Sequence, residues 1–163
     1  MIAEALGADP ERVVRVLDLL RAAGRTVATA ESLTAGLVSA VLTDVAGASD
    51  VVRGGLVVYA TDLKDLLAGV DSELLAERGA VHPQVAAQLA AGARAGCGAD
   101  WGIGLTGVAG PEPQDGVAPG TVHIGFAGPD TAVVRTAQLD GDRHAVRGAA
   151  VRVVLEHFEE LLR

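Results

Sequence analysis

Apolar residues recur along the chain with two different periods, and these periods predict alternating helices and strands. Val13, Leu17 and Leu20 lie at helical spacing. Because Asp9 can cap this segment and Gly24 can end it, we predict a first helix between them. The same reasoning predicts a strand at 26–30 that runs into a helix within 31–45. It also predicts a strand at 54–60, followed by a helix at 61–69 that Thr61 caps. Further along the chain we predict a short helix at 72–78, a helix at 82–98, a strand at 100–107 and a terminal helix at 142–162.

Residues 121–139 follow a different pattern from the rest of the chain. Two runs of apolar and polar alternation flank the turn residues 128–130, Gly-Pro-Asp, which predicts an antiparallel hairpin. The earlier strands are separated by helices, so the sheet is expected to be mixed. We therefore predict one domain over residues 1–163 with an α/β fold, a three-layer α/β/α sandwich around a mixed β-sheet.

Composition and charge narrow the classes of function. The formal net charge of -8 and the scattered arginines argue against a nucleic-acid surface, which needs clustered basic residues. A small-molecule substrate is the better expectation. The lone Cys97 excludes an internal disulfide and is most simply a small apolar residue. With neither a signal peptide nor an apolar run long enough for a membrane span, we expect a cytoplasmic protein that does not bind membranes.

The segment 106–120 is predicted to be a binding loop. It is rich in glycine and proline, and it is too long and irregular for a simple connection. Its glycine turns could bind an anion through backbone amides or could simply be flexible, and they match neither a Walker loop nor a dinucleotide fingerprint. Because the histidines lack metal-ligand spacing, we expect no metal and no cofactor.

Lys64 is the only lysine in a chain that carries twelve arginines, and it lies five residues after the only tyrosine, Tyr59. Arginine stays protonated in proteins, whereas a desolvated lysine near a helix start can lose its proton and act as a base. The plain alternative is that Tyr59 covers the core and Lys64 pairs with Asp62 or Asp65 on the surface. On these two residues alone, the plain alternative is favoured over a catalytic role. A catalytic role also requires a nucleophile.

Ser32 is the candidate nucleophile because it lies where a predicted strand meets a predicted helix. Its oxygen could gain from the helix dipole and from neighbouring amides. Serine is also a favoured helix N-cap, and Ser32 by itself indicates no more than that.

Five ordered stretches resemble the C-terminal domain of the CinA (competence/damage-inducible) family, here in the form of a standalone nicotinamide-nucleotide amidohydrolase. The resemblance extends over nearly the whole chain, and these stretches are its marks. They are TVATAESLTAGLVSAVLTDVAGASD at 26–50, GGLVVYATDLKDLLAGV at 54–70, GAVHPQVA at 79–86, LTGVAGP at 105–111 and GDRHAVR at 141–147.

The resemblance implies hydrolysis of the carboxamide of nicotinamide mononucleotide (NMN) to nicotinate mononucleotide and ammonia, without a metal, in pyridine-nucleotide salvage. It also implies a homo-oligomer, most simply a dimer. The family's catalytic serine, tyrosine and lysine correspond to Ser32, Tyr59 and Lys64. We expect substrate-binding roles for Glu31, Thr34, Gly36, Thr106, Gly107, Ala109, Gly110 and Arg143.

The chain departs from the family pattern at a few positions beside these residues. The family reads Glu-Ser-Cys-Thr-Gly-Gly where this chain has Leu33 for cysteine and Ala35 for the first glycine. After Tyr59, the usual Ser-Asn is replaced by Ala60 and Thr61. Two rival functions follow from the same sequence, namely a noncatalytic nucleotide- or partner-binding domain, and a serine-lysine hydrolase that acts on another amide.

Overall fold

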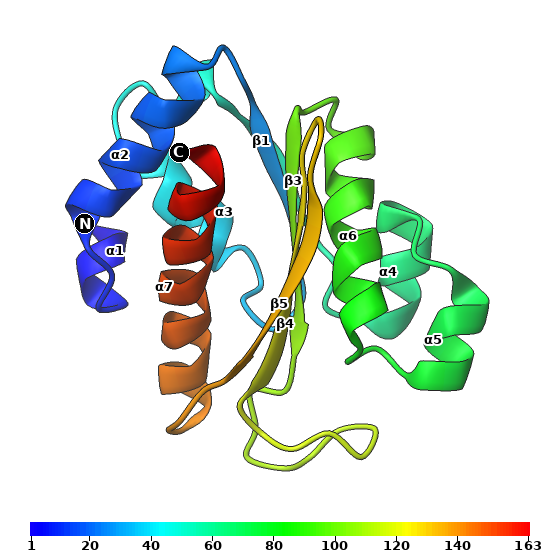
Figure 1. Cartoon of the computed structure of the whole chain (residues 1–163). Helices are drawn as coiled ribbons and strands as arrows, with labels where there is room; N and C mark the ends of the chain where they lie inside the picture. Colours follow the sequence, from blue (N-terminus) through cyan, green and yellow to red (C-terminus); the bar gives the residue numbers. More distant parts are fainter.

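The fold is a three-layer sandwich with one five-stranded sheet in the middle, as the sequence predicts (Figure 1). The computed structural model describes all residues from 1 to 163. The strands are β1 (Val27–Glu31), β2 (Val52–Val57), β3 (Trp101–Gly107), β4 (Thr121–Ala127) and β5 (Ala132–Gln138), in the order β2-β1-β3-β4-β5.

Helices cover both faces of this sheet. One layer contains α1 (Ile2–Ala5), α2 (Pro10–Ala22), α3 (Leu37–Thr43) and α7 (Arg143–Leu162), with a 3-10 turn at Ala48–Asp50. The opposite layer contains α4 (Thr61–Ala68), α5 (Ser72–Arg78) and α6 (Pro83–Gly96).

The sheet is mixed, and its parallel half positions the candidate site. β1 pairs in parallel with both β2 and β3, whereas β4 pairs antiparallel with β3 and, through the predicted hairpin, with β5. The carboxyl ends of β1, β2 and β3 therefore lie at one edge. Ser32, Tyr59 and the loop after Gly107 follow these three ends, which is where ligands bind in open α/β sheets.

The structure corrects two sequence-based element boundaries near the site. The helix expected within 31–45 begins only at Leu37, because Ala35 and Gly36 have φ values of +48° and +94°, which no α-helix accommodates. Thr61 is the first residue of α4 rather than its N-cap. The N-cap is Ala60, whose side chain offers no oxygen to the helix amides.

Glycines let α6 lie directly on the backbone of β3 and β4. A Cβ on Gly104 would overlap the Ala90 amide nitrogen and the Ala86 carbonyl oxygen of α6, and a Cβ on Gly125, the register partner of Gly104, would overlap the same carbonyl. The opposite face of the sheet packs through larger side chains in a cluster of 26 buried residues. The close approach of α6 fixes how the 79–82 segment before it meets the end of β3.

We predict that Gly104→Ala lowers the free energy of unfolding by about 1–3 kcal/mol, the usual cost of overpacking. The measurement is urea unfolding beside Gly96→Ala, which lies at the end of α6 with no atom within 4 Å of its added methyl group. The control should be neutral or slightly stabilising, since alanine favours helix. Equal effects from the two substitutions would contradict the close contact between α6 and the sheet.

Candidate active site

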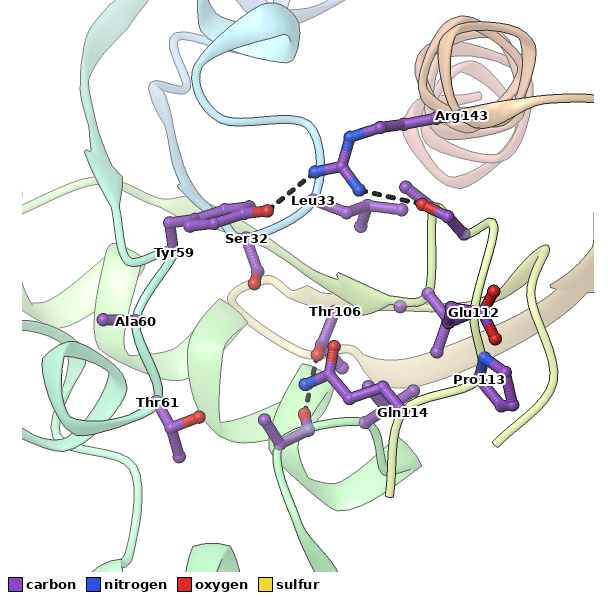
Figure 2. Close-up of a pocket in the computed structure, with 16 residues that line it drawn as sticks. Ser32, Leu33, Tyr59, Ala60, Thr61, Thr106, Glu112, Pro113, Gln114 and Arg143 are labelled. Atoms are coloured by element: carbon purple, nitrogen blue, oxygen red, sulfur yellow. Dashed lines mark hydrogen bonds between the residues drawn. The ribbon is translucent and has the colours of Figure 1, made fainter. Parts of the chain in front are cut away.

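A pocket of about 520 Å³ opens at the carboxyl edge of the parallel strands (Figure 2). Ser32 and Leu33 line it from the end of β1, and Arg143 lines it from the start of α7. The remaining lining residues come from three segments: Tyr59, Ala60 and Thr61 after β2; Ala80 and Val81 before α6; and Thr106, Gly107, Val108, Ala109, Gly110, Glu112, Pro113 and Gln114 from β3 and its loop. The pocket thus collects most of the residues that the sequence singles out.

Ser32 presents its hydroxyl to this pocket from a nearly buried position. The residue is 7% exposed, and its amide donates to the Leu105 carbonyl at 3.2 Å, which ties it to β3. Its hydroxyl makes no hydrogen bond to another protein group, so it is available to a bound molecule.

Two amides directly after Ser32 are buried without an acceptor. Leu33 is 3% exposed and Thr34 is fully buried, yet neither backbone N–H makes a hydrogen bond within the protein. The Thr34 hydroxyl is also buried and unpartnered. Buried amides are nearly always paired, so unpaired donors beside a serine stand out. Of the two residues, Leu33 lines the pocket, so its amide is the donor that a bound oxygen can reach.

Glu31 organises this loop from below rather than lining the pocket. Its fully buried carboxylate accepts hydrogen bonds from the amides of Val38 at 2.9 Å and Ser39 at 3.0 Å, and from the Thr29 hydroxyl at 3.1 Å. It therefore caps α3, whose own N-cap, Gly36, has no side chain. The sequence predicts a substrate-binding role for Glu31, but its carboxylate lies at the N-terminus of α3 and does not line the pocket.

Ala35 takes the backbone conformation that favours glycine. Its φ of +48° lies in the left-handed region, which costs an L-residue about 1–2 kcal/mol. This is the position where the family pattern has glycine. The departure is therefore tolerated at a cost in stability, whereas Leu33, the other departure in the loop, adds apolar surface to the pocket wall.

Arg143 bridges the rim of the pocket. Its guanidinium donates to the Tyr59 hydroxyl at 2.7 Å and to the Gly110 carbonyl at 3.0 Å, which links the starts of α7 and α4 to the loop after β3 (Figure 2). Tyr59 is 57% exposed, so this contact is accessible to an incoming molecule. The amides of Ala109 and Gly110 in the same wall make no hydrogen bond.

Lys64 is buried behind the pocket rather than exposed on its wall. Only 1% of the residue is exposed, and its Nζ donates to the carbonyls of Val58 at 2.8 Å and Tyr59 at 3.2 Å. Burial lowers the pKa of this amine from 10.5 to about 8. The surface ion pair with Asp62 or Asp65 is not formed, and no hydrogen bond joins Lys64 to Ser32.

Several expected binding residues lie beside the pocket without lining it, and some polar lining residues were not expected. Thr34 and Gly36 lie in the loop beneath, and the Thr106 hydroxyl, which does reach the wall, already donates to the Ala80 carbonyl at 2.6 Å. Glu112 and Gln114 add polar side chains that the sequence pattern did not single out. The one indication in the sequence that these two residues could line the pocket is that they lie in the predicted binding loop.

Neither a membrane span nor a metal cluster is present. None of the helices has the length and apolar character needed to cross a bilayer. No three His, Cys, Asp or Glu side chains gather as ligands for a metal ion.

The mixed sheet, with a serine-containing pocket at the carboxyl ends of its parallel strands, defines the class of protein as an α/β fold with a candidate site at the strand ends. A family model described as the CinA C-terminal domain matches residues 11–162, and the chain belongs to this family. A CinA-like protein of Frankia casuarinae is 49% identical over 156 residues, which cover 96% of this chain and 36% of that protein. A putative competence-damage inducible protein of Bacillus velezensis is 43% identical over 147 residues, 90% of this chain and 35% of that protein. The chain thus spans only about a third of the length of these curated relatives.

Solved structures of similar length share the fold. A CinA superfamily protein from Enterobacter cloacae superposes with a TM-score of 0.91 at 32% identity, covering 94% of this chain and 92% of that one. The competence/damage inducible protein CihA from Agrobacterium tumefaciens gives 0.89 at 34% identity, covering 94% and 95%.

We predict that Glu31→Gln lowers the free energy of unfolding by about 2 kcal/mol or more, because an amide nitrogen would face one of the two α3 amides and leave a buried donor unpaired. Chemical denaturation beside Glu77→Gln, an exposed carboxylate on α5, provides the comparison. If both substitutions cost the same, Glu31 does not hold the loop as described.

Proposed function

We propose that this protein is an amidohydrolase that deamidates NMN to nicotinate mononucleotide and ammonia. The observation that carries the proposal is that an unbonded Ser32 hydroxyl in the pocket is followed by Leu33, which also lines the pocket and whose amide has no hydrogen-bond partner. This arrangement suits acyl transfer, in which a nucleophile and oxyanion donors must face one carbonyl. Membership of the CinA family supports the choice of substrate through the resemblance described above.

In this mechanism Ser32 Oγ attacks the carboxamide carbon and its proton leaves to a base. The carbonyl oxygen becomes an oxyanion that the Leu33 amide binds, and one such donor is typically worth about 3–4 kcal/mol. The C–N bond then breaks, and the nitrogen leaves as ammonia with a returned proton. Water hydrolyses the resulting ester, which restores Ser32 and releases the carboxylate.

Lys64 is the proposed base, acting together with Tyr59. With a pKa of about 8, a large fraction of its amine is neutral just above neutral pH and can accept the serine proton. No hydrogen bond joins Lys64 to Ser32 without substrate, and catalytic hydrogen bonds often tighten only when substrate binds. Tyr59, whose backbone carbonyl touches Lys64 and whose hydroxyl reaches the rim, lies between the amine and the substrate.

The ribose phosphate of NMN needs local donors because the protein as a whole is acidic. Arg143 and the open amides of Ala109 and Gly110 occur together on one wall, and guanidinium groups and free amides are both good phosphate ligands. In this proposal Arg143 gives up its contact with Tyr59 to bind the phosphate.

The first test is ammonia release from NMN by purified protein in the presence of a metal chelator. We expect release by the wild type and its loss in Ser32→Ala, Lys64→Arg and Lys64→Met, because none of the three keeps both nucleophile and base. Ser49→Ala, an exposed serine at the 3-10 turn, is the matched control and should keep full activity.

The rival functions give different results in the same assay. A noncatalytic domain would bind NMN without releasing ammonia, and Lys64→Arg would keep that affinity. A serine-lysine hydrolase of another amide would leave NMN intact and release ammonia from a different member of a carboxamide panel. Release that survives Ser32→Ala would exclude Ser32 as the nucleophile.

The pH dependence tests the base. The neutral form of Lys64 is the active form, and burial lowers its pKa to about 8, so kcat/KM should rise as the pH increases through about 8 and level off above it. An unburied lysine would place the rise near 10.4. A rate that is flat between pH 7 and 9 would contradict a role for the neutral amine.

A further inference from the structure

Arg147 reaches from α7 to the loop that follows Ser32, and the mechanism above does not use it. Its Nε donates to the Leu33 carbonyl at 2.8 Å and its Nη2 donates to the Thr34 carbonyl at 3.3 Å. The side chain is half-buried and forms no salt bridge, so these two carbonyls are its hydrogen-bond partners. An arginine without a carboxylate partner is placed here for its fork of donors.

These two hydrogen bonds determine which way the neighbouring amides point. In a trans peptide the C=O and the following N–H point in opposite directions. With the Leu33 carbonyl turned toward Arg147, the Thr34 N–H must point away from α7. The Thr34 carbonyl also accepts from the Leu37 amide at 3.1 Å, and the Ala35 amide donates to the Ser32 carbonyl at 3.0 Å, so the next peptide is fixed as well.

The loop after Ser32 depends on hydrogen bonds from elsewhere, because it forms no regular secondary structure of its own. Residues 32–36 belong to no helix or strand, and Ala35 and Gly36 both have left-handed backbone conformations. Glu31 holds only the amides of α3, beyond the end of the loop. Arg147 is thus the one side chain that hydrogen-bonds to the backbone between the nucleophile and the helix.

We infer that Arg147 is a positioning residue, which holds the Leu33 and Thr34 carbonyls so that the loop after Ser32 keeps the unpaired Leu33 amide at the pocket wall, where it can bind the oxyanion. This inference rests on the proposed function, since it assumes that Ser32 attacks a carbonyl. The guanidinium also places a positive charge behind the peptides, which favours the negative oxygen in front of them.

A purely structural role for Arg147 is the alternative, and α7 provides its own matched control. Arg152 is also half-buried, and its Nη1 donates to the Leu6 carbonyl at 2.7 Å, far from the pocket. Arg147→Met and Arg152→Met should therefore lower the melting temperature by similar amounts. Only Arg147→Met should lower kcat.

The experiment measures kcat, KM and the melting temperature of wild type, Arg147→Met, Arg147→Lys and Arg152→Met with NMN. For Arg147→Met we expect kcat to fall by about 10²-fold, the size of effect that a small misplacement of reacting groups produces. KM should stay unchanged, since the donors act on the transition state. Arg147→Lys, which can hold one carbonyl but not both, should lie between wild type and Arg147→Met, and it serves as the test if Arg147→Met does not fold.

A second readout separates failure of this inference from failure of the proposed function. Labelling of Ser32 by a fluorophosphonate needs the same open Leu33 amide but no knowledge of the substrate. If wild type is labelled but does not deamidate NMN, the proposed substrate is wrong, and slower labelling of Arg147→Met than of Arg152→Met still supports the positioning role. The inference is overturned by equal kcat or equal labelling in the two methionine variants, by a rise in KM alone, or by a wild type that is not labelled at all.

Discussion

The buried carboxylate of Glu31 is the interaction on which the arrangement of the site depends. A charge removed from water is costly unless donors surround it, and here two helix amides and one hydroxyl do so. Glu31 is the last residue of β1, and the amides that it binds lie in the first turn of α3. The five residues between β1 and α3 must therefore cross a gap of fixed length. Ser32 is the first residue of that crossing, so the sheet and the helix together determine its position.

The same constraint explains why the site uses backbone as much as side chains. The α3 amides, which at another helix start would be free to bind an anion, are already occupied by Glu31. The open donor is instead the Leu33 amide within the crossing. On the facing wall, the glycines of β3 let α6 approach closely, and this brings the Ala80 segment against Thr106.

The sequence predicted the layers, the mixed sheet and the meeting of three strand ends, because hydrophobic periods and turn residues report local structure directly. It extended a helix back through residues 32–36, since Leu37, Val41 and Val45 keep a helical period while left-handed φ angles at Ala35 and Gly36 leave no trace in that period. The sequence singled out Lys64 because it is the only lysine in the chain. Burial is the cause of the low pKa of its amine, and the two carbonyl partners of Nζ depend on how β2 meets α4.

Long-range contacts were beyond the reach of sequence patterns. Arg147 ends the GDRHAVR stretch that resembles the family, but nothing in that stretch indicates what the side chain contacts, because its partners are 114 and 113 residues away. Glu112 and Gln114 lie in a loop whose composition indicated binding without indicating which side chains face inward. Such residues are identified only when the fold brings separate segments together.

The central claim is that Ser32 carries the acyl group during turnover. Rapid acid quenching of the protein during its first turnover with NMN, followed by mass analysis of its peptides, tests this claim most directly. The account predicts a transient adduct on the peptide containing Ser32, with the mass of the substrate less ammonia, which forms with the first release of ammonia and decays with the release of the carboxylate. Continued release of ammonia with no adduct on Ser32 at any quench time would contradict it.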